Sequence, residues 1–195
     1  MAIQNETIQN LFKDLYIDAE FTSLTLEALA AAEHKYLKDL KLNIGAALNK
    51  NTAISKKEAA LLALAAAVNE KCEVLVKAFT ELSKANEAND TEIAEMHAMA
   101  SLMNANNVLY RFRHYMHTNP NYGNIPAGLR MSIMMNPATG KEFFELGSLM
   151  ISALNNCELC ITSHEASVRQ HGATEQRVFE AIRIASVIKS FIAVL

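Results

Sequence analysis

The residues best suited to chemistry are two cysteines and a histidine in a C-x-x-C-x-x-x-H run, formed by Cys157, Cys160 and His164. Positions i, i+3 and i+7 of a helix share one face, so in a helix both thiols and the imidazole point the same way. Two thiols at this spacing can form a short disulfide, and an imidazole one turn beyond Cys160 can take its proton. The run therefore carries the groups that a dithiol redox site needs.

A carboxylate is available to support the histidine. Glu145 lies twelve residues before Cys157, near the start of the preceding apolar stretch, and is the natural candidate to orient His164. A lone carboxylate beside Lys141 and Glu142 is more often an ordinary solvated residue. Glu145 is singled out because its counterpart in an internal repeat of the chain is an alanine.

The two cysteines are expected to differ in role. Asn155 and Asn156 follow an apolar run, and they predict that one helix ends there and another begins at or next to Cys157. Unpaired N–H groups and the helix dipole favour a negative charge at such a start. Either sulfur can attack or resolve. We favour Cys160 as the thiol that His164 activates and Cys157 as the partner that closes the disulfide.

Other interpretations of the run stay open. Two buried cysteines can simply pack as small hydrophobic residues, as we expect for Cys72. A zinc ion could be held by Cys157, Cys160, His164 and Glu145, although structural zinc sites usually draw ligands from two separated knuckles. Covalent haem attachment is excluded, because the residue after Cys160 is Ile161 and not histidine. A thioredoxin-like site needs a βαβ context, which the chain lacks.

Length and composition narrow the class of protein. The 195 residues are 51% apolar and 20% charged with a net charge of −3, which suits one domain or a fused pair of small repeats. No basic run predicts nucleic-acid binding, and no charge-free apolar run reaches membrane-spanning length. The start lacks the pattern of a secretory signal, and three cysteines fit a reducing compartment. We therefore expect a cytoplasmic protein that binds neither nucleic acid nor membrane.

The sequence predicts an all-α fold, because helix-forming residues dominate and only six glycines and three prolines interrupt them. Ser55 with Glu58 forms a capping box, and Asn89 and Thr174 are expected N-caps. Residues 119–126 form the one clear turn-rich linker. The expected helices are 7–16, 24–48, 56–82, 90–117, 127–135, 140–154, 158–171 and 175–193.

The chain repeats itself at a shift of 85 residues. The chemical groups do not repeat, because Ala60, Leu75 and Phe79 stand where the second half has Glu145, Cys160 and His164. We therefore expect one domain over residues 1–195, with a structural repeat at about 56–117 and a catalytic repeat at about 140–195. Segment 93–101 also falls on 178–186. The residues shared at this shift are Lys56 with Lys141, Leu61 with Leu146, Leu64 with Leu149, Cys72 with Cys157 and Glu73 with Glu158.

With these residues the chain resembles the alkylhydroperoxidase D family, within the carboxymuconolactone-decarboxylase-like superfamily. The site pattern Glu145, Cys157, Cys160, His164 and Glu165 agrees with the family in spacing and in residue type. The resemblance implies an all-helical bundle with an internal duplication. Further segments that are similar to family segments are 107–113, 129–137 and 144–149.

The resemblance implies a redox-active disulfide between Cys157 and Cys160. Family members use this dithiol to reduce alkyl hydroperoxides or a partner peroxiredoxin. An external thiol or dihydrolipoyl-type donor restores it, and no bound cofactor or metal is implied. Carried over by position, Cys160 is the initiating thiol and Cys157 resolves, while His164 accepts the proton and Glu145 orients it. Family members form trimers or larger rings, so we expect a homo-oligomer, a trimer or a hexamer.

The chain departs from the family at Leu159, where well-known members have a histidine that takes part in the proton relay. Activation of Cys157 must then rely on the helix terminus or on other groups. The leading hypothesis is an antioxidant dithiol–disulfide oxidoreductase of the alkylhydroperoxidase type. The alternatives are a non-redox decarboxylase or isomerase of the superfamily, whose members typically lack the cysteine pair, and a zinc-stabilised helical interaction module.

Overall fold

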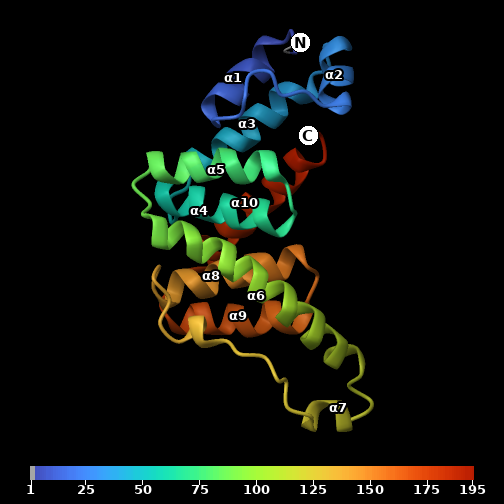
Figure 1. The fold of residues 1–195 in the computed structure, drawn as a ribbon, viewed down its shortest axis with the longest axis vertical. Helices are drawn as coiled ribbons and strands as arrows, with labels where there is room; N and C mark the ends of the chain where they lie inside the picture. The colour runs from blue at the N-terminus through green and yellow to red at the C-terminus, as the bar shows by residue number, and fades with distance from the viewer. Residues whose placement is uncertain (1–2) are drawn as a thin grey trace.

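The computed structural model describes residues 3–195, and over this range it consists of helices and loops without a β-strand. The predicted all-α fold is therefore confirmed (Figure 1). The α-helices are α1 (Glu6–Asp14), α2 (Leu24–Ala31), α3 (Tyr36–Asn49), α4 (Lys56–Asn69), α5 (Glu73–Ala85), α6 (Asp90–Tyr115), α7 (Asn121–Asn124), α8 (Lys141–Leu154), α9 (Glu158–Gln170) and α10 (Glu175–Ile192), with one 3₁₀ turn at Ser132–Met134.

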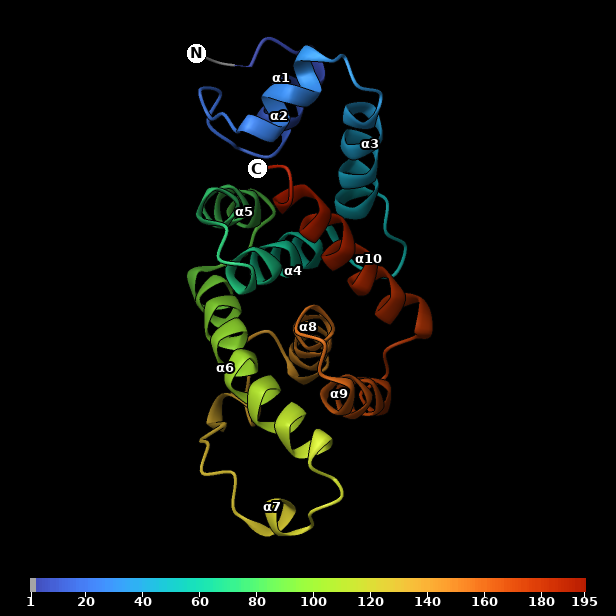
Figure 2. The same ribbon diagram turned by 90° about the vertical axis from the view of Figure 1, so that its right-hand side faces the viewer.

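The molecule is elongated, with α1, α2 and α3 at one end and a projecting segment that carries α7 at the other (Figure 1). Helices α4, α5 and α10 form the middle, and α8 and α9 lie beneath them, crossed by the long α6. Figure 2 shows α10 running back from α9 toward α3. Ser23 Oγ donates to the carbonyl oxygen of Val194 at 2.6 Å, which ties the C-terminus to the N-terminal helices. No helix in residues 3–195 is long and apolar enough to cross a membrane.

The core is built around α4 and α8, which are buried on nearly all sides. Residues 59–67 of α4 are all buried, and so are residues 143–152 of α8. At Gly147 of α8 an added Cβ would lie 2.5 Å from the sulfur of Met99, so α6 packs against bare backbone there. Glu145 belongs to this run of α8, and its carboxylate is therefore placed inside the core.

Two helices that the sequence predicted as continuous are each divided in two. The predicted 24–48 helix breaks into α2 and α3 at Glu33, and the predicted 56–82 helix breaks into α4 and α5 at Lys71. Glu33 has a φ of 46° and Lys71 a φ of 59°, which is the left-handed conformation that often ends a helix. Glutamate and lysine are ordinary helix formers, so residue type did not signal either break.

The helix predicted at 127–135 is wrong. Only Ser132–Met134 form a 3₁₀ turn there, and residues 126–131 are irregular. Pro126 lacks a backbone donor and Gly128 has a φ of 67°, so a helix does not start despite the apolar side chains that follow. The predicted linker contains the short α7. The caps predicted at Ser55, Asn89 and Thr174 are confirmed.

The helix bounds support the predicted duplication. Helices α4 and α5 recur 85 residues later as α8 and α9, and α6 and α10 begin at the same shift. The left-handed residues also recur at this shift, Lys71 with Asn156 and Glu87 with Gly172. We infer that residues of about 56–117 and 140–195 are two copies of one three-helix unit.

Each copy holds the other through a buried glutamate on its third helix. Glu180 of α10 accepts hydrogen bonds from the backbone N–H groups of residues 52 and 53, just before α4, at 3.0 and 2.9 Å. Glu95 of α6 accepts those of residues 138 and 139, just before α8, at 2.6 and 2.8 Å. Glu95 and Glu180 are themselves 85 residues apart, so one kind of tie is made twice, in opposite directions.

Glu180 remains ionised in this tie. Burial would raise the pKa of its carboxyl group, but hydrogen bonds from Thr52, Gln176 and Ala53 outweigh burial and lower the pKa to about 2. The charged form, with two acceptor oxygens, is therefore the one that holds the loop before α4.

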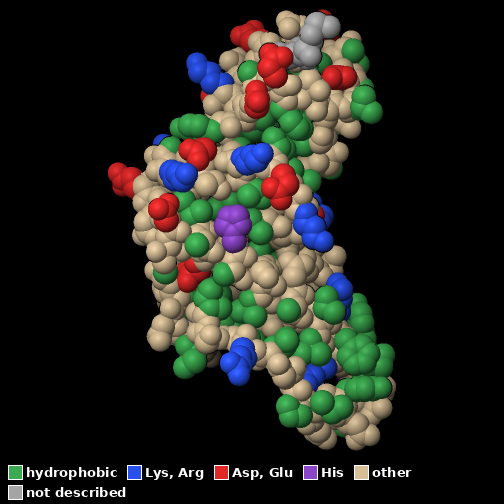
Figure 3. Space-filling model, viewed as in Figure 1, with side chains coloured by type: hydrophobic (Ala, Val, Ile, Leu, Met, Phe, Trp, Pro, Cys, Tyr) green, Lys and Arg blue, Asp and Glu red, His purple; other side chains and the backbone are tan. Residues whose placement is uncertain are grey.

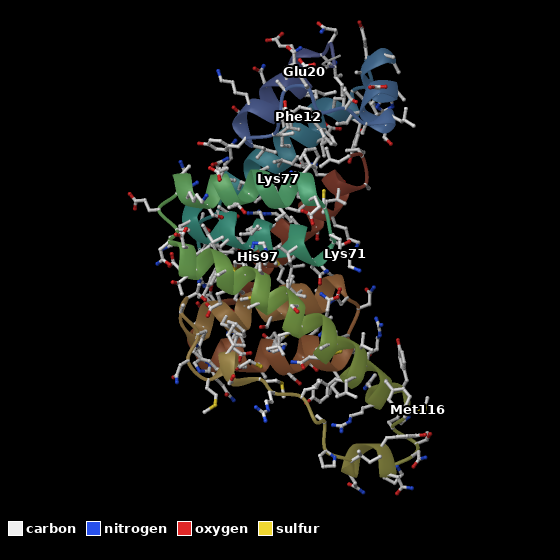
Figure 4. The ribbon with its side chains drawn as sticks, viewed as in Figure 1. Phe12, Glu20, Lys71, Lys77, His97 and Met116 are labelled. Carbon is white, nitrogen blue, oxygen red and sulfur yellow. A yellow bond between two sulfur atoms is a disulfide. The ribbon has the colours of Figure 1, made fainter. Side chains whose placement is uncertain are left out.

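Glu180→Gln should lower the free energy of unfolding by about 1–3 kcal/mol, because an amide offers one acceptor oxygen where the carboxylate uses two. Urea unfolding at pH 7, followed by circular dichroism, measures the difference. Glu20→Gln in an exposed loop (Figure 4) is the matched control and should change stability by less than about 0.5 kcal/mol. Equal stability of the Glu180→Gln variant and the wild type would contradict the importance of the tie.

Candidate active site

The candidate site lies where α9 packs against α8. Glu145 comes from α8, and Cys157, Cys160 and His164 come from the start and first turns of α9. Cys157 is the N-cap residue of α9, and Asn156 before it turns the chain with a φ of 55°. The helix start predicted at Cys157 is thus confirmed. The predicted site residues all fall at this one junction of two helices.

Cys157 and Cys160 are joined by a disulfide, with their Cα atoms 5.3 Å apart. Cys157 is fully buried and Cys160 is 6% exposed, so Cys160 is the more accessible of the two. The backbone N–H of Cys157 donates to the carbonyl oxygen of Ser152 at 3.1 Å, which closes the turn from α8. The pair therefore stands in the oxidised state of a dithiol.

Buried Glu145 and partly buried His164 form a short hydrogen bond, with Nδ1 of His164 2.6 Å from Oε2 of Glu145. Burial would raise the pKa of the Glu145 carboxyl group, but the hydrogen bonds and charges of His164 and Lys141 outweigh burial and lower it to about 2. An ionised carboxylate can only accept, so Nδ1 of His164 must carry the proton in this contact. The other ring nitrogen, Nε2, is left as the basic one when the ring is neutral.

Lys141 is the second partner of the Glu145 carboxylate, and the sequence analysis did not assign it a role. Its Nζ lies 2.8 Å from Oε1 of Glu145, and Nζ also donates to the carbonyl oxygen of Met134 at 2.8 Å. Each oxygen of Glu145 therefore has its own cationic or N–H partner. The i, i+4 spacing of Lys141 and Glu145 on one helix was the available signal. The contact with Met134 also connects the site to the segment that leads from α7 to α8.

A network of side-chain amides holds the turn before Cys157, and it too was missed. Asn155 Nδ2 donates to Oδ1 of Asn107 at 2.9 Å, and Asn107 Nδ2 donates to Ser152 Oγ at 2.9 Å. Arg111 Nη1 donates to the carbonyl oxygen of Asn155 at 2.7 Å. Asparagine is unfavourable inside helices, so the three asparagines in segment 104–107 were the signal. The first copy thus fixes the turn that presents the disulfide.

Cys72 is the structural counterpart of Cys157 and has no such chemistry. It is the N-cap residue of α5, half-buried and free, and it packs against the core. Burial raises the pKa of its thiol. Its sequence neighbour at the CxxC spacing is Leu75, so the first copy has no second sulfur at the equivalent position.

The zinc arrangement considered from the sequence requires both cysteines as free thiolates. In the structure their sulfurs form a disulfide, and His164 is hydrogen-bonded to Glu145. Within residues 3–195 no group of three or more His, Cys, Asp or Glu side chains is placed to hold a metal ion. The geometry corresponds to a disulfide beside an acid–base pair.

Known proteins share this sequence over most of its length. Residues 120–195, which include the four site residues, match the carboxymuconolactone decarboxylase family. An alkyl hydroperoxide reductase AhpD of Maricaulis maris is 42% identical over 175 residues, covering 88% of this chain and 98% of the relative. AhpD proteins of Solibacter usitatus and Rhizorhabdus wittichii are 38% and 39% identical, covering 88% and 86% of this chain and 96% and 95% of the relatives.

An all-helical fold with a disulfide beside a hydrogen-bonded histidine–glutamate pair defines a dithiol–disulfide protein built on the fold of the carboxymuconolactone decarboxylase family. The near full-length matches are more specific. The chain belongs to the AhpD family, which confirms the resemblance seen in its site residues.

Thiol counting should distinguish two redox states of this chain. Denatured protein should give three free thiols after reduction and one, from Cys72, after mild oxidation with an alkyl hydroperoxide, because Cys157 and Cys160 pair. The Cys72→Ser variant is the control and should give two and none. Three thiols after peroxide treatment, with no sulfenic or sulfinic acid by mass spectrometry, would contradict a redox-active pair.

Acid should weaken the stabilising contribution of Glu145. Because the pKa of Glu145 is about 2 in the folded protein against an ordinary 4.5, its contribution is complete above about pH 4.5 and is lost as the pH falls toward 2. Lys141→Met removes one partner, so the folded pKa should rise, the contribution of Glu145 at neutral pH should be smaller, and its loss should be complete at a higher pH. The measurement is the free energy of unfolding of the oxidised protein against pH.

Lys77→Met is the matched control for this experiment, because Lys77 is an exposed lysine on α5 (Figure 4). Its stability profile should follow that of the wild type. Superimposable profiles for Lys141→Met and Lys77→Met would show that Lys141 does not hold the charge of Glu145.

Proposed function

We propose that this protein is an antioxidant dithiol–disulfide oxidoreductase that reduces alkyl hydroperoxides through Cys157 and Cys160. The observation that carries the proposal is the disulfide at the start of α9, one helical turn from a histidine held by an ionised glutamate. Membership of the AhpD family supports it, because the relatives are alkyl hydroperoxide reductases by name. The cysteine pair disfavours the non-redox alternative.

Cys160 is the thiol that initiates the reaction in this proposal. His164 lies at i+4 from Cys160 on α9, so its free Nε2 is the nearest base that the helix provides for that thiol. Glu145 fixes the ring through Nδ1 and stabilises the imidazolium that forms when the proton is taken. Lys141 balances the charge of Glu145, which keeps the carboxylate from binding that proton itself.

The peroxide step then follows the chemistry of thiolates. The Cys160 thiolate attacks one peroxide oxygen and breaks the O–O bond, and the alkoxide leaves with a proton from the imidazolium as the alcohol. Cys160 becomes a sulfenic acid. The Cys157 thiol attacks its sulfur, water leaves, and the disulfide seen in the structure is the product.

An external dithiol must return the pair to the reduced state. Because Cys157 is fully buried and Cys160 is 6% exposed, a slender donor of the dihydrolipoyl type can approach Cys160 most easily. Attack there releases Cys157 as a thiolate at the N-terminus of α9, where the helix favours negative charge. Reduction of a peroxiredoxin would need the surroundings of Cys160 to open. A cytoplasmic location suits this cycle, since reduced donors are kept there.

Leu159 between the cysteines is 39% exposed and supplies no base. Proton transfer at the pair therefore rests on His164 alone in this proposal, where related proteins place a second histidine. The apolar side chain beside the sulfurs also disfavours the charged thiolate. We expect a slower peroxidase than relatives with histidine at this position.

We also propose that the protein assembles as a trimer or hexamer through the projecting segment. Figure 3 shows hydrophobic side chains gathered at the α7 end of the molecule, and a contiguous apolar surface of this kind marks an interaction site. Met116 marks the end of α6 there (Figure 4). The exposed apolar residues of α6 and of the α7 segment that form this surface are Val108, Phe112, Tyr115, Met116, Tyr122 and Ile125.

Substitutions in the relay should slow peroxide consumption to different degrees. His164→Gln should lower the rate by about 10²–10⁴-fold, because it removes the base. Glu145→Gln should lower it less, and the double variant should be faster than the two losses added together predict, because the two residues act as one unit. Stopped-flow consumption of cumene hydroperoxide by pre-reduced protein measures these rates. An unaffected Glu145→Gln variant would remove Glu145 from the relay.

The cysteine variants test the order of the two thiols. Cys160→Ser should abolish the reaction, whereas Cys157→Ser should consume one equivalent of peroxide and stop as a sulfenic acid, which dimedone traps. Cys72→Ser is the matched control and should keep full turnover. Trapping of the sulfenic acid on Cys157 in the Cys160→Ser variant would reverse the assigned roles.

Charge placed on the projecting segment should break the assembly. The double variant Val108→Asp and Ile125→Asp should reduce the mass measured by light scattering to that of one chain. Val108 is 61% and Ile125 57% exposed on the apolar surface, so each substitution places a charge in the proposed interface. Leu24→Asp is the control, since Leu24 is 87% exposed on α2 at the opposite end. Loss of assembly in the control alone would place the interface on the N-terminal helices.

A further inference from the structure

A cavity lies in the N-terminal half of the chain, formed by residues far in the sequence from the disulfide. Its volume is about 500 Å³, within the roughly 300–1,000 Å³ of small-molecule sites. It is lined by residues between 11 and 86, which belong to α1, α3, α4 and α5 and to their ends. Figure 1 shows α1 and α3 stacked above α5 and α4. No residue of the candidate active site contributes to this cavity.

Part of the cavity wall is apolar. Leu11, Leu15, Ile44 and Leu48 line it from α1 and α3, and all four are buried in the core. Gly45 lies among them in the middle of α3, and a Cβ added there would meet nothing within 4 Å. Glycine is unfavourable inside a helix relative to alanine. The missing side chain at Gly45 therefore leaves open space in this cavity.

Three ammonium groups surround this cavity. Lys41, Lys50 and Lys56 line it against one carboxylate, that of Asp14. The ion pairs found among residues 3–195 include none for these three lysines. A cavity with a buried apolar wall on one part and an excess of cations on the other suits a ligand with an alkyl chain and an anionic head.

The second copy shows what Lys56 lacks. Its counterpart Lys141 is paired with Glu145 at 2.8 Å, whereas Ala60 stands where the first copy would need that carboxylate. Ala60 itself lines the cavity. The first copy thus keeps the lysine and loses its internal counter-charge, and a carboxylate from outside the chain can supply it. Phe79 replaces the histidine, so a ligand bound here meets no redox group.

We propose that this cavity binds a fatty acid, with the alkyl chain against Leu11, Leu15 and Leu48 and the carboxylate among Lys41, Lys50 and Lys56. Binding at this site needs neither Cys157 nor Cys160, and it goes beyond peroxide reduction.

Isothermal titration with dodecanoate below its micellar concentration tests the proposal on the oxidised protein. Binding should saturate at one molecule per chain. Dodecyltrimethylammonium, with the same chain and the opposite charge, should bind at least tenfold more weakly. Equal binding of the two probes would overturn the carboxylate assignment, and absence of saturable dodecanoate binding would overturn the site.

Two variants locate the site. Gly45→Phe fills the cavity and should weaken dodecanoate binding at least tenfold, while the matched Gly45→Ala adds one methyl group and should bind within about twofold of the wild type. Replacing Lys41, Lys50 and Lys56 together by glutamine should weaken dodecanoate binding about tenfold and leave dodecanol binding unchanged. If Gly45→Phe fails to fold, the triple-lysine variant still tests whether dodecanoate binds in this cavity.

Unchanged dodecanoate affinity in both the Gly45→Phe and the triple-lysine variants would place the ligand elsewhere and overturn the proposal. Light scattering of Gly45→Phe at the same concentrations serves as a further check. A drop in its mass relative to Gly45→Ala would show that a second copy of the chain occupies the cavity, which would also overturn the proposal.

Discussion

The burial of α8 is the constraint on which the site depends. Residues 143–152 are buried on every face of that helix, so a charge on Glu145 is not solvated by water and must be met by protein groups. His164 and Lys141 meet it, one at each oxygen. The same contacts fix the imidazole ring in orientation and in tautomer. In the proposed mechanism, one set of hydrogen bonds therefore both neutralises a buried charge and orients the base.

Much of the fold and most of the site followed from local sequence patterns. The helix starts at Ser55, Asn89 and Thr174 were predictable because capping chemistry is short-range. The start at Cys157 was predictable because Asn155 and Asn156 mark the end of the preceding helix. The breaks at Glu33 and Lys71 were not, because a left-handed residue at a helix end is set by how the following helix packs. The repeat does predict one of these breaks, because the helix end predicted at 155–156 lies 85 residues after Lys71.

Cys157, Cys160 and His164 were predicted because their spacing places two thiols and an imidazole on one face of a helix. Lys141 was missed although its partner Glu145 lies one turn away on the same helix. The amide network of Asn107, Ser152 and Asn155 was missed for a different reason. Their partners come from α6 and α4, and the pairing depends on tertiary contacts that the sequence does not display. Asparagines in a helix interior indicate that some polar partner exists, but they do not indicate which one.

The crossed carboxylates of Glu95 and Glu180 have a consequence for how the chain folds. The N–H groups leading into α4 depend on α10, and those leading into α8 depend on α6. Neither three-helix copy is hydrogen-bonded to completion without the other, and buried unpaired N–H groups are costly. We therefore expect the two copies to unfold together, as one cooperative unit. Isolated from the first copy, the redox half would be an incomplete domain and not a minimal enzyme.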